Sequence, residues 1–253
     1  MLAVNWKVFL ASATGKQHLD ADAPCQDSGY WGVVDGLLVG VVCDGAGSAS
    51  QGHEGAQFLA RWLGEALAVL PASWPAGGSA AELRELLLPV IESTRADLAS
   101  IARARELTLR DFACTLVGCL ATAAGGCFFH VGDGFAIHMA ASGASLLSLP
   151  ENGEYADETY FVSDESWKDH LRVTPLGPVR PGDCIGLMTD GAAPFAVNRQ
   201  RTGFFRPFID PVASYLAAAG AADGNLALHG VLADSKTHAI TGDDKTLLLA
   251  LAG

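Results

Sequence analysis

Apolar residues change their spacing along the chain, and these changes predict where strands and helices lie. Short apolar runs bounded by turn residues are typical of strands, whereas apolar residues at every third or fourth position are typical of helices. Strands are predicted at residues 4–13, 30–34, 37–43, 112–122, 127–131, 135–140, 145–149, 183–189 and 245–251. Asp35 and Gly36 form the expected two-residue hairpin turn between the second and third strands.

Four stretches have the spacing of amphipathic helices. They cover residues 50–70, 80–105, 207–219 and 224–234. Pro89 lies inside the second stretch. We expect it to kink or divide that helix, because proline cannot donate the backbone hydrogen bond.

The order of these elements predicts the α+β fold class. Strands come in antiparallel runs with pairs of helices between them, whereas a parallel sheet would show strands and helices in alternation. No segment has a composition of its own and no internal repeat is visible, so a single domain over residues 1–253 is predicted. Residues 150–178 are acidic and aromatic without a clean period, and we interpret them as a flap-like excursion over the site.

The overall composition narrows the class of protein. The net charge of −12 argues against a nucleic-acid-binding surface, which needs a stripe of basic residues. No apolar run reaches the roughly 18 residues of a membrane span, so no membrane partner is predicted. Most of the six cysteines lie in apolar, strand-like runs and none forms a Cys-x-x-Cys pair. This pattern favours free thiols and a cytoplasmic location over disulfides or zinc.

The stretch VVCDGAGSA, residues 41–49, carries the most informative chemistry. A carboxylate that ends an apolar strand beside glycines, here Asp44, is a common way to hold a hard cation, although Asp-Gly is also an ordinary turn dipeptide. The pattern recurs at Asp133, Asp190 and Asp243. If these carboxylates converge, their mutual repulsion indicates a divalent cation, and all-oxygen ligation favours Mg²⁺ or Mn²⁺. Two such ions about 3.5–4 Å apart would activate water for hydrolysis. The spacing alone leaves convergence open.

Other catalytic motifs are absent from the sequence. GAGSAS fails the dinucleotide pattern G-x-G-x-x-G because Ser50 stands at the third glycine. There is no P-loop, no G-x-S-x-G nucleophile motif and no Cys-x5-Arg loop. Because these motifs are absent, the aspartates are the main candidates for catalytic or metal-binding residues.

The segment GEYADETYFVSDESW, residues 153–167, resembles a bacterial branch of the metal-dependent protein phosphatases of the type 2C family. Six short motifs in a fixed order resemble those of the family as a whole. They are CQDS, VVCDGAGS, DFACTL, VGDG, LMTDG and GDDKT, and the resemblance spans roughly residues 12–250. It implies a central sandwich of two antiparallel β-sheets with helices on both outer faces. It also implies hydrolysis of phosphoserine and phosphothreonine in proteins by a water that bridges two metal ions, Mn²⁺ or Mg²⁺, with a weaker third ion.

The resemblance also implies a role for each aspartate. Asp44 would bridge both metals, and Gly45 would offer its backbone carbonyl to the second. Asp190 and Asp243 would complete the first ion's ligands and, with Asp44, form the catalytic set. Two further metal-site residues are implied: Asp133 would help Asp190 to hold the third ion, and Asp27 would contact a metal or its waters.

The sequence departs from the family pattern at three points. Gln26 stands where the family often has glutamate, and Ala46 stands where many members carry a histidine proposed as general acid. The arginine that usually grips the phosphate is missing. His18 and Lys16 are the available substitutes, and we predict His18 as the phosphate-binding residue.

Partners and alternative functions follow from the same resemblance. The predicted partners are a phosphoprotein substrate, a cognate serine/threonine kinase and a von Willebrand type A domain protein. The departures at Gln26 and Ala46 motivate an alternative, a catalytically weak module that binds or senses phosphoproteins on the same fold. A third hypothesis is hydrolysis of phosphoesters that are not proteins.

Overall fold

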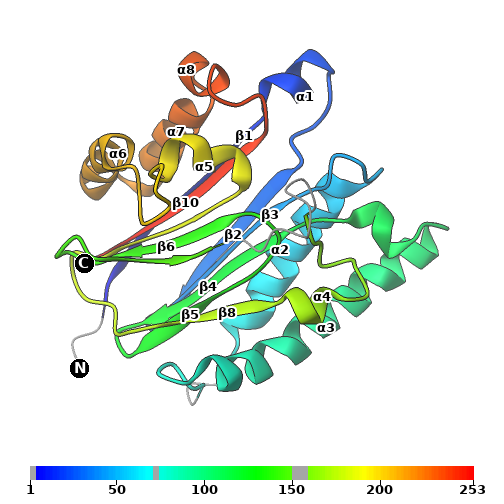
Figure 1. Cartoon of the computed structure of the whole chain (residues 1–253), viewed down its shortest axis with the longest axis horizontal. Helices are drawn as coiled ribbons and strands as arrows, with labels where there is room; N and C mark the ends of the chain where they lie inside the picture. The colour runs from blue at the N-terminus through cyan, green and yellow to red at the C-terminus, as the bar shows by residue number, and fades with distance from the viewer. Residues whose placement is uncertain (1–3, 71–73, 150–158) are drawn as a thin grey trace.

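Two five-stranded sheets, antiparallel throughout, form the centre of the protein (Figure 1). The computed structural model describes residues 4–70, 74–149 and 159–253. The first sheet has the order β1 (Trp6–Ala13), β10 (Lys245–Ala252), β9 (Cys184–Met188), β6 (Phe135–Met139) and β7 (Ser145–Ser148). The second has the order β2 (Asp27–Val34), β3 (Leu37–Asp44), β4 (Leu116–Thr122), β5 (Gly125–Val131) and β8 (Arg172–Leu176).

Strand β3 shows how the layers are held together. Leu38 and Val42 pack between the two sheets, whereas Val39, Val41 and Cys43 pack toward the helices. Both faces of the strand are therefore buried, which is why its sequence is a continuous apolar run without polar alternation. The Asp35-Gly36 hairpin turn is confirmed, and both of its residues have positive φ angles, as this tight turn requires.

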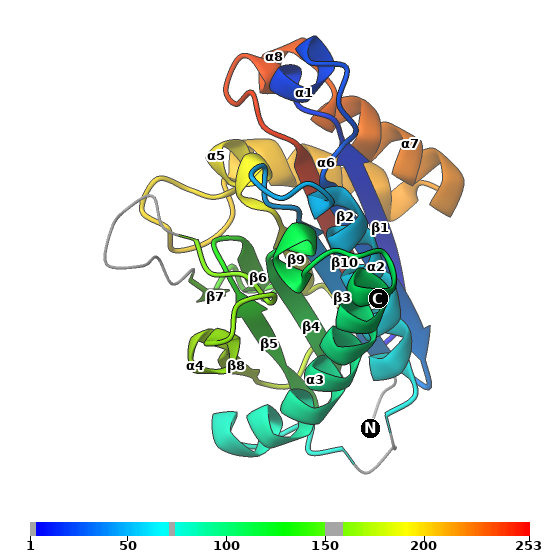
Figure 2. The same cartoon turned by 90° about the vertical axis from the view of Figure 1, so that its right-hand side faces the viewer.

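Helices cover the outer face of each sheet, so the expected sandwich with helices on both sides is confirmed (Figures 1 and 2). The second sheet is covered by α2 (Gly52–Ala68) and α3 (Ala80–Ala104). The first is covered by α5 (Ala193–Ala196), α6 (Arg206–Ala218) and α7 (Ala221–Leu232). Burial of apolar side chains against both faces of both sheets supplies most of the driving force for this arrangement.

The expected division of a helix at Pro89 is wrong. Helix α3 runs without a break from Ala80 to Ala104, with Pro89 inside it. Ser79 caps its first turn through a reciprocal bond with Glu82, and its buried stripe continues beyond the proline to Leu98. Pro89 lies on the exposed side, so water can solvate the carbonyl that it leaves without a partner.

The interpretation of residues 150–178 as one irregular excursion is also wrong in part. Residues 150–158 lie outside the described residues. The remainder holds the short helix α4 (Trp167–His170) and the edge strand β8, which pairs with β5. Strand β8 is mostly solvent-facing and contains Pro175, so its sequence lacks the apolar alternation that identifies a strand.

Besides α5, four further short elements were not predicted, because none spans enough residues to show a period. They are α1 (Lys16–Asp20), η1 (Leu109–Phe112), η2 (Asp190–Ala192) and α8 (Ser235–His238). Helices α1 and α8 lie side by side at one end of the sandwich (Figures 1 and 2). The loops that follow them lead to the candidate site.

All six cysteines are free thiols, as predicted. Among the described helices, none combines the length and the apolar character needed to cross a bilayer.

A buried carboxylate outside the candidate site provides a test of the fold. Asp183 is 5% exposed and accepts hydrogen bonds from His138 Nε2 (2.9 Å), Ala141 N (3.0 Å) and Arg180 N (2.9 Å). Asp183→Ala should lower the free energy of unfolding by about 2–4 kcal/mol, because it removes the charged acceptor of three partly buried hydrogen bonds. Urea denaturation would measure the loss. Asp210→Ala, which removes only an exposed pair with Arg206, should cost much less, and an equal cost would contradict the argument.

Candidate active site

Five predicted site aspartates lie at one end of the sandwich, where neighbouring antiparallel strands end and begin. Asp44 ends β3, and Asp27, which begins β2, is its direct cross-strand partner. Asp133 lies in the turn between β5 and β6, Asp190 follows β9, and Asp243 precedes β10. The two sheets therefore bring together carboxylates that are up to about two hundred residues apart in sequence.

Asp44 lies at the centre of this group. Burial raises its pKa well above the usual range, and the neighbouring carboxylates of Asp27, Asp190 and Asp243 raise it further. Its carboxyl group interacts directly with that of Asp190. Its backbone N–H donates to Thr115 Oγ1 (3.0 Å), which fixes the end of β3 against the start of β4. The site therefore concentrates negative charge where water is largely excluded.

Asp27 is buried directly beside Asp44. Thr189 Oγ1 donates a hydrogen bond to Asp27 Oδ2 (2.7 Å), whereas Asp27 Oδ1 is buried and has no hydrogen-bond partner among the described residues. Burial raises the pKa of Asp27 to about 7, and the charges of Asp244 and Asp190 add to the effect. A buried carboxylate oxygen without a donor is costly unless another positive group contacts it.

Asp190 resembles Asp27 in its raised pKa and in its unpartnered carboxylate oxygen. Burial, followed by the charges of Asp133 and Asp243, raises its pKa to about 6. Its Oδ1 atom is also buried without a hydrogen-bond partner within the described part of the chain. Asp133 is anchored from outside the group, because Thr159 Oγ1 donates to its Oδ2 atom (2.6 Å).

A cavity of about 290 Å³ opens over these carboxylates. Asp44, Asp133 and Asp243 line it together with His18 and the turn that follows β3. Gly45 in that turn is required by close packing, since a Cβ there would lie 2.4 Å from the Gly52 carbonyl carbon and 2.9 Å from the Gln26 carbonyl oxygen. The glycine therefore lets the backbone reach the floor of the cavity.

These residues fit a hard divalent cation. The donor atoms are carboxylate oxygens, no arginine is among the described residues that line the cavity, and two of the oxygens are buried without partners there. Among the described residues, no three side chains of His, Cys, Asp or Glu are already close enough to enclose one ion. Backbone carbonyls, waters and substrate oxygens would complete the shell, as is usual for Mg²⁺.

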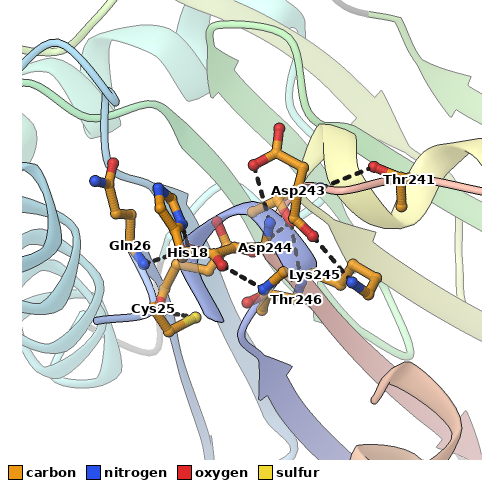
Figure 3. Close-up of polar contacts among 11 residues, drawn as sticks. His18, Cys25, Gln26, Thr241, Asp243, Asp244, Lys245 and Thr246 are labelled. Atoms are coloured by element: carbon orange, nitrogen blue, oxygen red, sulfur yellow. Dashed lines mark hydrogen bonds and ion pairs between the residues drawn. The ribbon is translucent and has the colours of Figure 1, made fainter. Parts of the chain in front are cut away.

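Asp244, which was not predicted as a site residue, is the hub of a second network (Figure 3). Its Oδ1 atom accepts from Gly15 N (2.6 Å), and its Oδ2 atom accepts from Gln26 N (2.5 Å) and lies 2.8 Å from His18 Nδ1. The adjacent Lys245 is fully buried and donates to the Asp243 carbonyl (2.9 Å), and burial lowers its pKa. Both residues therefore hold the backbone around Asp243 in place.

Sequence reasoning placed His18 near the site but assigned it to phosphate, whereas the structure shows one of its ring nitrogens bound to Asp244. Lys16, the other substitute considered, forms an exposed ion pair with Asp20. The contacts of Thr159 and Thr189 were not predicted, because they join segments without a common motif. The doubled aspartate of GDDKT was the one available signal for Asp244.

Comparisons with known proteins find relatives over nearly the whole chain. Residues 14–233 match the family model described as protein phosphatase 2C. Serine/threonine-protein phosphatase 3 of Escherichia coli (strain K12) is 34% identical over 258 residues, covering 98% of this chain and 99% of the relative.

Solved structures share the fold at low sequence identity. A serine/threonine phosphatase of S. agalactiae superposes with a TM-score of 0.64 at 16% identity, covering 98% of this chain and 99% of the other. RsbX, solved in complex with magnesium, superposes with a TM-score of 0.59 at 15% identity over the whole of both chains. Stp1 from Staphylococcus aureus gives 0.61 at 16% identity, covering 99% of this chain and 95% of the other.

Proposed function

The chain belongs to the protein phosphatase 2C family and is a protein serine/threonine phosphatase, and from this premise we propose that two ions of Mn²⁺ or Mg²⁺ in the carboxylate site drive its reaction. The observation that supports the proposal most directly is the group of buried and half-buried carboxylates around Asp44, including unpartnered oxygens of Asp27 and Asp190. Without a metal cation, the carboxylates of Asp27, Asp44 and Asp190 are destabilised in their charged form by burial and by the neighbouring carboxylates.

We assign the ligands by the family pattern. Asp44 would bridge both ions, Asp190 and Asp243 would complete the first, and the Gly45 carbonyl would contribute to the second. When bound, the ions supply the positive charge that favours ionisation of a water and neutralises the phosphoryl oxygens.

Two further residues act at the edge of this ligand set. Asp133, held by Thr159, would serve a weaker third ion with Asp190. Asp27, held by Thr189, would contact a metal or its waters. In both cases the threonine orients the carboxylate, which is how second-layer hydrogen bonds commonly tune a metal site.

The substrates of this protein are phosphoproteins, as its protein phosphatase activity requires. A partner kinase, a von Willebrand type A domain protein and a cytoplasmic location remain predictions. The same holds for phosphate binding by His18. A non-catalytic binding module would gain nothing physically from keeping so many repelling carboxylates buried, and this favours the active enzyme.

Metal dependence of peptide turnover tests the proposal. After EDTA treatment and dialysis, the protein should not hydrolyse a phosphothreonine peptide, and Mn²⁺ or Mg²⁺ should restore turnover. Asp190→Asn should lower kcat/KM at least about 100-fold. Turnover that survives chelation, or an undiminished Asp190→Asn variant, would contradict the metal assignment. A panel of small phosphoesters hydrolysed better than phosphopeptides would favour the third hypothesis.

A further inference from the structure

The candidate site needs a proton donor that its carboxylates do not provide. Hydrolysis of a phosphoserine or phosphothreonine releases a strongly basic alkoxide, which leaves far more readily when a positioned acid protonates it. Asp44 and Asp243 would be ionised as metal ligands and can only accept hydrogen bonds. Ala46, in the turn beside Asp44, has no polar side-chain atom.

His18 is the one histidine, lysine or arginine among the described residues that line the cavity. Its ring comes from α1 and lines the cavity together with the turn after β3, and its side chain is 23% exposed. It therefore has access both to a bound substrate and to solvent.

Asp244 fixes the orientation of this ring (Figure 3). The side chain of Asp244 is 1% exposed and accepts hydrogen bonds from the backbone N–H groups of Gly15 and Gln26. The carboxylate of Asp244 is the acceptor in both of these bonds, so the Nδ1–H group of His18 is the donor in its bond to Oδ2. Nε2 is then the ring nitrogen that Asp244 does not use.

We propose that His18, oriented by Asp244, donates the Nε2 proton to the seryl or threonyl oxygen as it leaves phosphorus. The inference rests on the proposed function. The oxygen of the attacking water bonds to phosphorus, and the bond from phosphorus to the side-chain oxygen breaks, leaving its electron pair on that oxygen. The His18 proton completes the hydroxyl group. The proton lost by water passes to solvent, from which His18 is protonated again, and inorganic phosphate is released.

The test compares two substrates that differ in their need for a proton. The leaving group of a phosphothreonine peptide needs one, whereas p-nitrophenolate is stable enough to leave without it. At saturating Mn²⁺, His18→Asn should lower kcat on the peptide by about 100-fold or more and on p-nitrophenyl phosphate by only a few-fold. Asparagine keeps an N–H group near the position of Nδ1, so the bond to Asp244 is preserved. The ratio of the two losses does not depend on the folded fraction.

Asp244→Asn tests the positioning role. It should lower kcat with the same selectivity for the peptide, because the carboxylate that holds the His18 ring in place is lost. Asp20→Asn, an exposed change on the same helix, should leave both rates within about twofold, since surface pairs contribute little.

Three results would overturn the inference. Equal losses on both substrates for His18→Asn would indicate phosphate binding or a structural role. Undiminished peptide turnover would exclude His18 as the donor. A wild-type protein that is inactive on both substrates with Mn²⁺ would refute the proposed function itself, and the inference with it.

Discussion

Asp44→Asn should abolish phosphatase activity and at the same time stabilise the metal-free protein. Asp44 is buried among Asp27, Asp190 and Asp243, so its charge is repelled from several sides when no cation is present. Removing that charge relieves the repulsion, and we expect Tm in EDTA to rise by about 2 °C or more. The same change removes the proposed bridge between the ions, so kcat/KM should fall by at least about 1,000-fold. The stabilisation produced by Mn²⁺ in the wild type should also be lost.

Asp35→Asn is a matched control, because Asp35 lies at the opposite end of the same β2–β3 hairpin. Asparagine is at least as favourable as aspartate at this turn position with positive φ. Activity and the Mn²⁺-induced rise in Tm should therefore match the wild type. An Asp44→Asn protein that is less stable than the wild type in EDTA would contradict the repulsion argument, even if its activity were lost.

The layers and the convergence of the aspartates were predicted from the resemblance to the family, because the spacing of the motifs left convergence open. Each of Asp44, Asp133 and Asp190 follows an apolar strand, and in antiparallel sheets the ends of alternate strands meet at one edge. The order of the motifs indicated the family, and the fold of the family implies that motifs from both sheets meet at one site. At these positions the apolar sequence pattern agrees with the fold, because burial of the strand requires the apolar run and also places the strand inside the sandwich.

What could not be predicted depends on contacts between distant segments. Asp244 is indistinguishable from Asp243 by local pattern, and its role follows from Gly15 and Gln26, which approach it only in the folded chain. Strand β8 carries no apolar alternation because it lies at an exposed edge. The continuity of α3 through Pro89 depends on which side of the helix faces water, which periodicity alone does not determine.

Gly191→Ala should both destabilise the fold and disable the site. Gly191 follows Asp190 in η2, and a Cβ there would lie 1.8 Å from the Asp244 carbonyl oxygen and 3.2 Å from the Asp243 Cβ. The opposing backbone cannot easily retreat, because Asp244 is bonded to Gly15 and Gln26 on its other side. Relieving the overlap requires η2 to move away from the start of β10. We expect a loss of about 2–3 kcal/mol in unfolding free energy, measured by urea denaturation.

The same displacement would separate Asp190 from Asp243, which the proposed function places around one ion. The folded fraction of Gly191→Ala should therefore need more Mn²⁺ for half-maximal phosphatase activity than the wild type, by at least about 10-fold. Gly230→Ala is the matched control, because Gly230 lies in α7 with open space around it. Alanine there should leave the Mn²⁺ requirement unchanged and stabilise the helix by up to about 1 kcal/mol. If Gly191→Ala lost stability while keeping the wild-type Mn²⁺ requirement, the contact between η2 and β10 would support the fold without setting the spacing of the ligands.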